Sequence, residues 1–166
     1  MTGPGVRVGQ GVDVHAFSRD PTRRLVLCGV EVPNAPGLAG HSDADVGLHA
    51  VADALLSAAA LGDLGSRFGV DRPETAGADS AVLLAEVVAE VAAGGWAIGN
   101  LDVTLVAQQP RLAPYRAAMR ARVAAVCRLD VGAVSVGFTT TDHLGAVGRG
   151  EGIVGLAVCL LVRAHG

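Results

Sequence analysis

Segments with the apolar pattern of β-strands alternate with segments of helical pattern along the chain, and this order limits the fold more than any other feature. Residues 6–17 alternate in polarity and include β-branched positions, which predicts a strand. The stretch 43–62 has helical periodicity and is rich in Ala and Leu, which predicts a helix. Because the two kinds of segment mix from end to end, we expect an α/β or α+β sandwich with helices on one face of a sheet.

The other segments complete this pattern. Further strands are predicted over 25–32, 96–108, 133–141 and 152–163, and further helices over 81–93 and 114–128. Ser80 stands where it can cap the helix that follows it. Residues 63–79 contain Gly, Pro and Asp and are expected to form a long loop, a length that is usually functional or mobile.

The composition indicates one domain with partner subunits. A chain of 166 residues predicts a single domain over residues 1–166. Hydrophobic residues make up 51% and charged residues 17%, which is apolar for a monomer whose whole surface faces water. We therefore expect part of the surface to be covered in a homo-oligomer.

Charge and cysteine content restrict the partners and the compartment. The net charge of −3, with scattered cations, argues against nucleic acid as a partner. No apolar run is long and unbroken enough to predict a membrane span. Cys28, Cys127 and Cys159 are odd in number and lie in apolar settings, which predicts buried free thiols in a reducing compartment. We expect a cytoplasmic protein.

Three of the five histidines lie with several carboxylates in two short stretches, GVDVHAF at 11–17 and HSDADVGLHAVAD at 41–53. Residues two apart on a strand share a face, so Asp13 and His15 should point the same way. Val12, Val14 and Ala16 should then point into the core. An isolated pair of this kind is more often an ordinary polar surface.

The helix that follows offers a third ligand. Asp45, His49 and Asp53 are spaced four apart and should form one polar stripe, opposite an apolar stripe over 51–58. Asp13, His15 and His49 would then form a ligand set that suits Zn²⁺ and leaves one coordination position open. Asp45 and Asp53 are expected to accept the proton of the other His49 ring nitrogen. A plain solvated helix face is the alternative interpretation.

Four motifs in order resemble the 2-C-methyl-D-erythritol 2,4-cyclodiphosphate synthase family, nearly from end to end. They are GVDVHAF, GHSDADVGLHAVADALLSAAALGDLG, NLDVTLVAQQPRLAPY and TTTDHLGAVGRGEG. The resemblance implies an enzyme in which the 2-phosphate of a CDP-linked methylerythritol attacks the β-phosphorus, which expels CMP and closes a cyclic diphosphate. It also implies a ferredoxin-like sandwich that assembles as a homotrimer with active sites between subunits.

The resemblance also implies roles for residues at matching positions. Asp13, His15 and His49 look like the Zn²⁺ ligands, and Asp142 occupies the position that binds Mg²⁺ or Mn²⁺ between the phosphates. His41 and Thr140 match the positions that stabilise the reacting phosphates. The other substrate contacts implied are Ser42, Asp63, Leu64, Gly65, Phe68, Ala107, Gln108, Gln109, Pro110, Arg111, Leu112, Thr139, Thr141 and Arg149.

Four features depart from the family pattern: the sequence GVDR at 69–72, and Phe138, Asp142 and Ala146. Phe138 is expected to crowd the cytidine pocket, and the GVDR segment belongs to the loop that closes over the substrate. Two alternative functions stay open at this point. One is a zinc-dependent phosphohydrolase, in which water replaces the 2-phosphate as nucleophile; the other is a non-catalytic trimer that binds a diphosphate.

Overall fold

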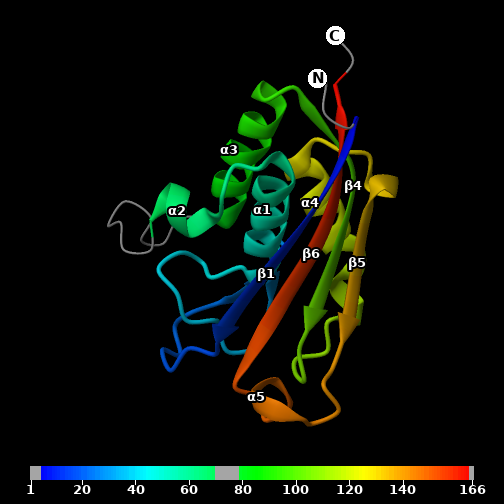
Figure 1. Cartoon of the computed structure of the whole chain (residues 1–166). Helices are drawn as coiled ribbons and strands as arrows, with labels where there is room; N and C mark the ends of the chain where they lie inside the picture. Colours follow the sequence, from blue (N-terminus) through cyan, green and yellow to red (C-terminus); the bar gives the residue numbers. More distant parts are fainter. Residues whose placement is uncertain (1–4, 70–78, 165–166) are drawn as a thin grey trace.

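A computed structural model describes residues 5–69 and 79–164, in which the main sheet has four strands. Helices pack against one face of this sheet (Figure 1). The strands are β1 (Val6–Ala16), β2 (Leu25–Leu27), β3 (Val30–Val32), β4 (Trp96–Val106), β5 (Val134–Thr139) and β6 (Gly152–Arg163). The helices are α1 (Val46–Ala59), α2 (Leu64–Phe68), α3 (Ser80–Ala93), α4 (Arg116–Cys127) and α5 (Gly145–Gly148), with 3₁₀ turns at Ala113–Tyr115 and Val131–Ala133. The predicted mixed α+β sandwich is confirmed, whereas the ferredoxin-like assignment stays a prediction.

The order of strands in the main sheet is β1-β6-β4-β5. Strand β6 runs antiparallel to both β1 and β4, and β4 runs parallel to β5. The carboxyl ends of β1, β4 and β5 therefore lie at the same end of the sheet. Strands β1 and β5 form its two opposite edges, so residues that follow them are at the same end but at different edges.

Helix α1 lies directly on the backbone of β1 because glycines occupy the contact. A Cβ atom at Gly9 would stand 2.0 Å from the carbonyl oxygen of Ala54, and one at Gly11 would stand 2.0 Å from that of Ala50. No side chain fits in either gap, since real Cβ atoms never approach so closely. This close approach brings His49 of α1 beside Asp13 of β1.

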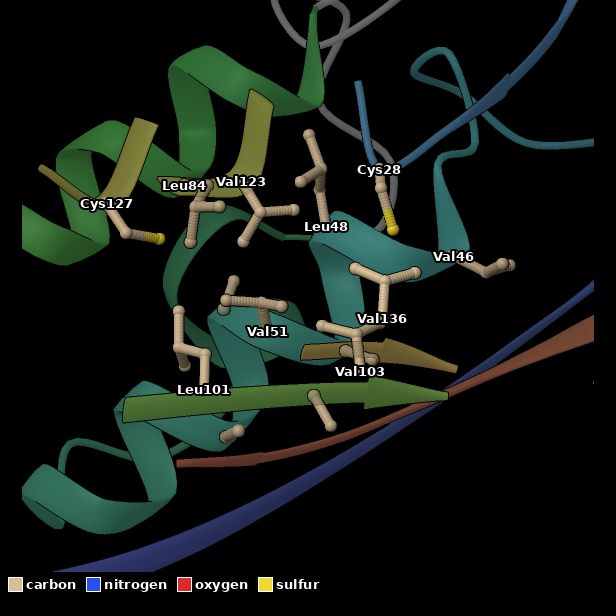
Figure 2. Packing of buried hydrophobic residues seen from close by; sticks show 14 of the residues in the cluster. Cys28, Val46, Leu48, Val51, Leu84, Leu101, Val103, Val123, Cys127 and Val136 are labelled. Carbon is tan, nitrogen blue, oxygen red and sulfur yellow. The ribbon is translucent and has the colours of Figure 1, made fainter. Parts of the chain in front are cut away.

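The orientation predicted for β1 was wrong. Val12 and Val14 are 51% and 60% exposed on the outer face of the sheet, whereas Asp13 and His15 face the helices. Ala16 is also exposed. The core instead fills the space between the sheet and α1, α3 and α4, where Figure 2 shows Val51 of α1 close to Leu101 and Val103 of β4, and Leu48 of α1 on the side of Leu84 and Val123. The apolar stripe predicted on α1 is confirmed, because Val51, Ala54, Leu55 and Ala58 are all buried.

Three local predictions were also wrong. Residues 25–32 form two strands rather than one, because Cys28 and Gly29 both adopt positive φ angles, 50° and 70°, and turn the chain. Residues 64–68 of the predicted loop form α2, and residues 70–78 lie outside the described part. Ser80 is the first residue of α3, and Asp79 is its cap.

Among the described residues, no helix combines the length and apolar character needed to cross a membrane.

Candidate metal centre and ligand pockets

Asp13, His15 and His49 converge at the carboxyl end of β1. Oδ2 of Asp13 lies 3.1 Å from Nε2 of His15 and 3.0 Å from Nδ1 of His49. One ligand atom from each residue lies within 4.8 Å of the other two, and all three side chains are half-buried. The two residues predicted from β1 and the one predicted from α1 therefore come together as expected.

The far nitrogen of each imidazole has its own hydrogen-bond partner. Nδ1 of His15 lies 2.5 Å from the carbonyl oxygen of Ala39, which can only accept, so this nitrogen donates and leaves the lone pair on Nε2. Nε2 of His49 lies 2.9 Å from Oγ of Ser80. One carboxylate and two imidazole nitrogens that face a common point are a donor set that suits Zn²⁺ with an open position.

The charges in this cluster favour an ionised carboxylate. Burial by itself raises the pKa of Asp13, but the hydrogen bonds and charges of His15 and His49 outweigh it and hold that pKa well below its usual range. The hydrogen bond with Asp13 raises the pKa of His15 above its ordinary value, although burial opposes this. Asp13 is thus an anion at neutral pH, the form in which a carboxylate binds a metal.

The roles predicted for Asp45 and Asp53 beside His49 were wrong. The Asp45 side chain is completely buried and accepts hydrogen bonds from the backbone N–H groups of Cys28, Gly29, Gly47 and Leu48, so it caps α1. Burial raises the pKa of Asp45 to about 6, with the N–H donors acting in the opposite direction. Asp53 accepts from the backbone N–H of Leu64 at 2.8 Å and so connects α1 to α2. Burial raises its pKa as well.

A cavity of about 310 Å³ opens beside the three ligands. It brings together most of the phosphate and sugar positions that the resemblance implied around this site. The lining residues include Asp13, His15, His41, Ser42, His49, Asp53, Leu64, Gly65 and Phe68. Asp63 does not line it; this residue caps α2 through its side chain and accepts from the N–H of Ser66.

An arginine holds the loop that carries His41 and Ser42. Arg23 donates from Nη1 to the carbonyl oxygen of Gly40 at 3.0 Å and from Nη2 to that of Ser42 at 2.7 Å. The two carbonyl groups flank His41, so both ends of this short segment are fixed. Sequence reasoning gave Arg23 no role, because its contacts are to backbone atoms that no pattern reveals.

A second cavity, of about 500 Å³, lies at the carboxyl ends of β4 and β5. It is lined by Ala107, Gln108, Gln109, Pro110, Arg111, Leu112, Ala113, Phe138, Thr139 and Thr140. All six residues predicted for the cytidine pocket are therefore neighbours in one cavity. The departure at Phe138 also faces this cavity, and the guanidinium of Arg116 lies 5.1 Å from the centre of its ring.

Thr139 is the last residue of β5, and Thr140, Thr141 and Asp142 follow it directly on the next loop. The backbone N–H of Asp142 donates to Oγ1 of Thr140 at 3.2 Å, and Asp142 is exposed. Asp142 does not belong to the Asp13 cluster, so in one chain the two predicted metal sites are separate. Arg149 is exposed and donates from Nε to Glu151 at 2.6 Å.

The remaining departures from the family pattern are Ala146 and the GVDR segment at 69–72. Ala146 is exposed within α5. Gly69 ends α2, and the other three residues of the GVDR segment, 70–72, lie outside the described part of the chain.

Sequence reasoning missed the contact that Ser80 and Asp43 make with His49. Ser80 is 1% exposed, and its hydroxyl lies between the Asp43 carboxylate and the His49 ring. Asp43 was visible in the polar stretch, but Ser80 comes 31 residues after His49. The only available signal was a serine at the start of a predicted helix, and that signal fits a cap equally well.

Comparisons with known proteins agree on one family. The model of the YgbB family matches residues 6–162. The "2-C-methyl-D-erythritol 2,4-cyclodiphosphate synthase" of Chromobacterium violaceum is 54% identical over 158 residues, which cover 95% of this chain and 99% of that protein. Two solved structures are similar as well. The bifunctional IspDF of Campylobacter jejuni has a TM-score of 0.91 at 36% identity. This match covers 95% of the present chain and 42% of the Campylobacter chain. The CDP complex of Plasmodium falciparum IspF has a TM-score of 0.86 at 29% identity. This match covers 99% of the present chain and 100% of the Plasmodium chain.

Proposed function

The chain belongs to the YgbB family, and from this premise we propose that it converts 4-CDP-2-C-methyl-D-erythritol 2-phosphate to 2-C-methyl-D-erythritol 2,4-cyclodiphosphate and CMP. This is a step of isoprenoid precursor synthesis in the non-mevalonate pathway. An oxygen of the 2-phosphate forms a bond to the β-phosphorus, the bond from that phosphorus to the bridging oxygen breaks, and CMP leaves with this oxygen. The enzyme is then a phosphorus–oxygen lyase. The observation that carries the proposal is the Asp13–His15–His49 cluster, which opens into a cavity lined by His41 and Ser42.

The residues of the chain position charge rather than supply a nucleophile. A phosphate oxygen is already anionic at neutral pH, so the reaction mainly needs orientation and charge neutralisation. Asp13, His15 and His49 are the residues that would hold Zn²⁺, which when bound supplies a Lewis acid to the phosphate oxygens. Asp142 would hold Mg²⁺ or Mn²⁺ together with the substrate phosphates.

The hydroxyl and imidazole groups around the cavities contribute directional hydrogen bonds. His41 stands on the loop that Arg23 fixes, so its ring can be oriented toward a phosphate in the cavity beside Asp13. Thr140 lines the second cavity, where its hydroxyl can donate to a phosphate oxygen. The segment Ala107–Leu112 would hold the cytidine, because these six residues line one cavity. A relative of the same fold has been solved as a CDP complex.

The positions of the two cavities support a homotrimer with active sites between subunits. The metal cluster lies at the carboxyl end of β1, at one edge of the sheet, and the 107–113 cavity lies near β5 at the other edge. Among the residues that the structure describes, the two cavities share no lining residue. A head-to-tail ring would place the first edge of one subunit against the second edge of the next, which is how a cyclic oligomer closes. The exposed valines at positions 6, 8, 12 and 14 provide an apolar face for such contacts.

We also propose a cytoplasmic location. Cys28, Cys127 and Cys159 are all buried and free of disulfide bonds, which suits a reducing compartment.

Phosphorus NMR of the purified protein with the CDP-linked substrate, Zn²⁺ and Mg²⁺ tests the function. We expect two coupled phosphorus resonances of a cyclic diphosphate to appear together with the resonance of CMP. The matched control is His49→Ala, which removes one proposed ligand and should form neither product. Linear phosphates alone would indicate hydrolysis and contradict the proposal, and so would binding without turnover.

A further inference from the structure

Ser80 is the first residue of α3, and its hydroxyl is enclosed beside the metal cluster. The residue is 1% exposed, and two polar groups lie against its Oγ atom. The carboxylate of Asp43 accepts a hydrogen bond from this hydroxyl, and Nε2 of His49 lies 2.9 Å away. The helix cap itself is provided by Asp79, so the Ser80 side chain is not needed to start α3.

The chemistry of the three groups fixes the direction of both hydrogen bonds. An ionised carboxylate only accepts, and Asp43 already receives the backbone N–H groups of Ser80 at 3.1 Å and of Asp45 at 3.2 Å. The single hydroxyl proton of Ser80 therefore points to Asp43. Its oxygen then has only lone pairs left for His49, so Nε2 of His49 must be the donor. Ser42 Oγ is a more distant neighbour of the same nitrogen, at 3.4 Å.

We propose that Ser80, oriented by Asp43, is a positioning residue that keeps the proton on Nε2 of His49 and so presents the Nδ1 lone pair to the metal. This inference rests on the metal site proposed above. His15 is held in the complementary way, because its Nδ1 donates to the backbone carbonyl of Ala39. The two imidazoles are thus fixed through opposite ring nitrogens, one by a backbone group and one by a pair of side chains from α3 and the 41–45 loop.

The arrangement predicts a specific dependence of zinc affinity on the Ser80 hydroxyl. Partners that orient a metal-binding histidine typically change metal affinity by roughly 10–100-fold when they are removed. Ser80→Ala deletes the acceptor of the Nε2 proton without touching any ligand. Asp43→Asn offers an N–H in place of an accepting oxygen, and it should free the hydroxyl to turn its proton toward His49.

The test is a competition between the purified protein and a zinc chelator of known affinity, applied to wild type and variants. We expect Ser80→Ala and Asp43→Asn each to weaken zinc binding by roughly 10–100-fold, and Ser80→Thr to recover part of the loss by restoring a hydroxyl. Asp79→Ala is the matched control, because it removes the true cap of α3, a 2.8 Å bond to the N–H of Ala81, and leaves Ser80 in place. It should keep wild-type zinc affinity.

Nitrogen-15 NMR of the histidine rings in the zinc-loaded wild type tests the same inference without any variant, so it does not require the variants to fold. We expect the proton of His49 on Nε2 and slow exchange of this proton with solvent. A proton on Nδ1 would overturn the inference, and so would folded Ser80→Ala with unchanged zinc affinity. If the wild type binds no zinc in the competition, the proposed metal site itself fails, which is a different result from a zinc-binding wild type with an indifferent Ser80→Ala.

Discussion

Asp13 and Asp45 belong to the same polar region of the sequence and have opposite surroundings in the fold. Asp45 is completely buried and accepts four backbone N–H groups at 2.5–3.0 Å, so its acceptor capacity is used by the protein itself. Asp13 is partly exposed, and its Oδ2 faces two imidazole nitrogens. Neutral imidazole nitrogens with lone pairs cannot satisfy a carboxylate, so this cluster is completed only by protons or by a cation.

The difference shows what distinguishes a structural carboxylate from a binding one. Backbone donors around Asp45 connect the β2–β3 turn to the start of α1, and they leave no space for a ligand. The neighbours of Asp13 are side chains from two elements, arranged at the wall of a cavity. The same substitution at both positions should therefore have effects on different properties of the protein.

The largest effect is expected from Asp13→Asn, and it should be on catalysis. The change removes the anionic ligand, and metal-supplied charge stabilisation is worth several kcal/mol, so we expect turnover to fall by about 1000-fold. The free energy of unfolding should fall by no more than about 1 kcal/mol, because in the described part of the chain this carboxylate contacts the His15 and His49 side chains, from which an asparagine oxygen can still accept a hydrogen bond. Product formation by phosphorus NMR and urea unfolding of the same preparation measure both quantities. Wild-type turnover in metal-free Asp13→Asn would contradict the metal site.

Asp45→Asn should instead act on stability. One amide oxygen cannot satisfy four N–H donors, and the amide N–H₂ group faces donors, so we expect the free energy of unfolding to fall by about 2–3 kcal/mol. The folded fraction should bind zinc with wild-type affinity, since the Asp45 side chain accepts from backbone N–H groups and not from the side chain of a proposed ligand. Urea unfolding and chelator competition check the two statements. A loss of zinc affinity in the folded variant would erase the distinction between the two carboxylates.

The pH dependence of the unfolding free energy should also differ between wild type and Asp45→Asn. Burial raises the pKa of Asp45 to about 6 in the folded state, above its value in the unfolded chain. Between about pH 4 and that pKa the folded state binds more protons, so the contribution of Asp45 to stability decreases as the pH rises through this window. Asp45→Asn lacks this contribution, so its deficit relative to wild type should be largest near the lower pH and narrow toward the upper one. A stability difference between wild type and Asp45→Asn that widens as the pH rises would contradict the raised pKa of Asp45.

The ligand cluster could be predicted because it depends on short-range geometry. Asp13 and His15 share a strand face by their spacing, and the helix period and family motif pointed to His49. The role of Asp45 was missed because the predicted helix began at residue 43, whereas α1 begins at Val46. With the correct start, an aspartate directly before the helix is the expected cap. Ser80 could not be found, since its contact joins two elements that only tertiary packing brings together.

The face of β1 that is buried could not be predicted either. Alternation identified the strand correctly, and the valine face looked like the one to bury. The structure buries Gly9 and Gly11 instead, because α1 packs against the bare backbone there, and it leaves the valines outside. The general rule that apolar side chains point inward applies to the assembled protein, so an exposed valine face is itself an argument for contacts with other subunits.

The smallest effect is expected from Asp53→Asn, at a third carboxylate that combines features of the other two. Asp53 lines the metal cavity, as Asp13 does, but its Oδ1 accepts a backbone N–H, that of Leu64 at 2.8 Å, as Asp45 does. An asparagine oxygen can keep this single hydrogen bond. We therefore expect zinc affinity to change by less than about threefold and the free energy of unfolding to change by less than about 1 kcal/mol. Chelator competition beside Asp13→Asn is the measurement. A zinc loss of tenfold or more would mean that the charge of Asp53, and not only the contact partners of each carboxylate, contributes to holding the metal.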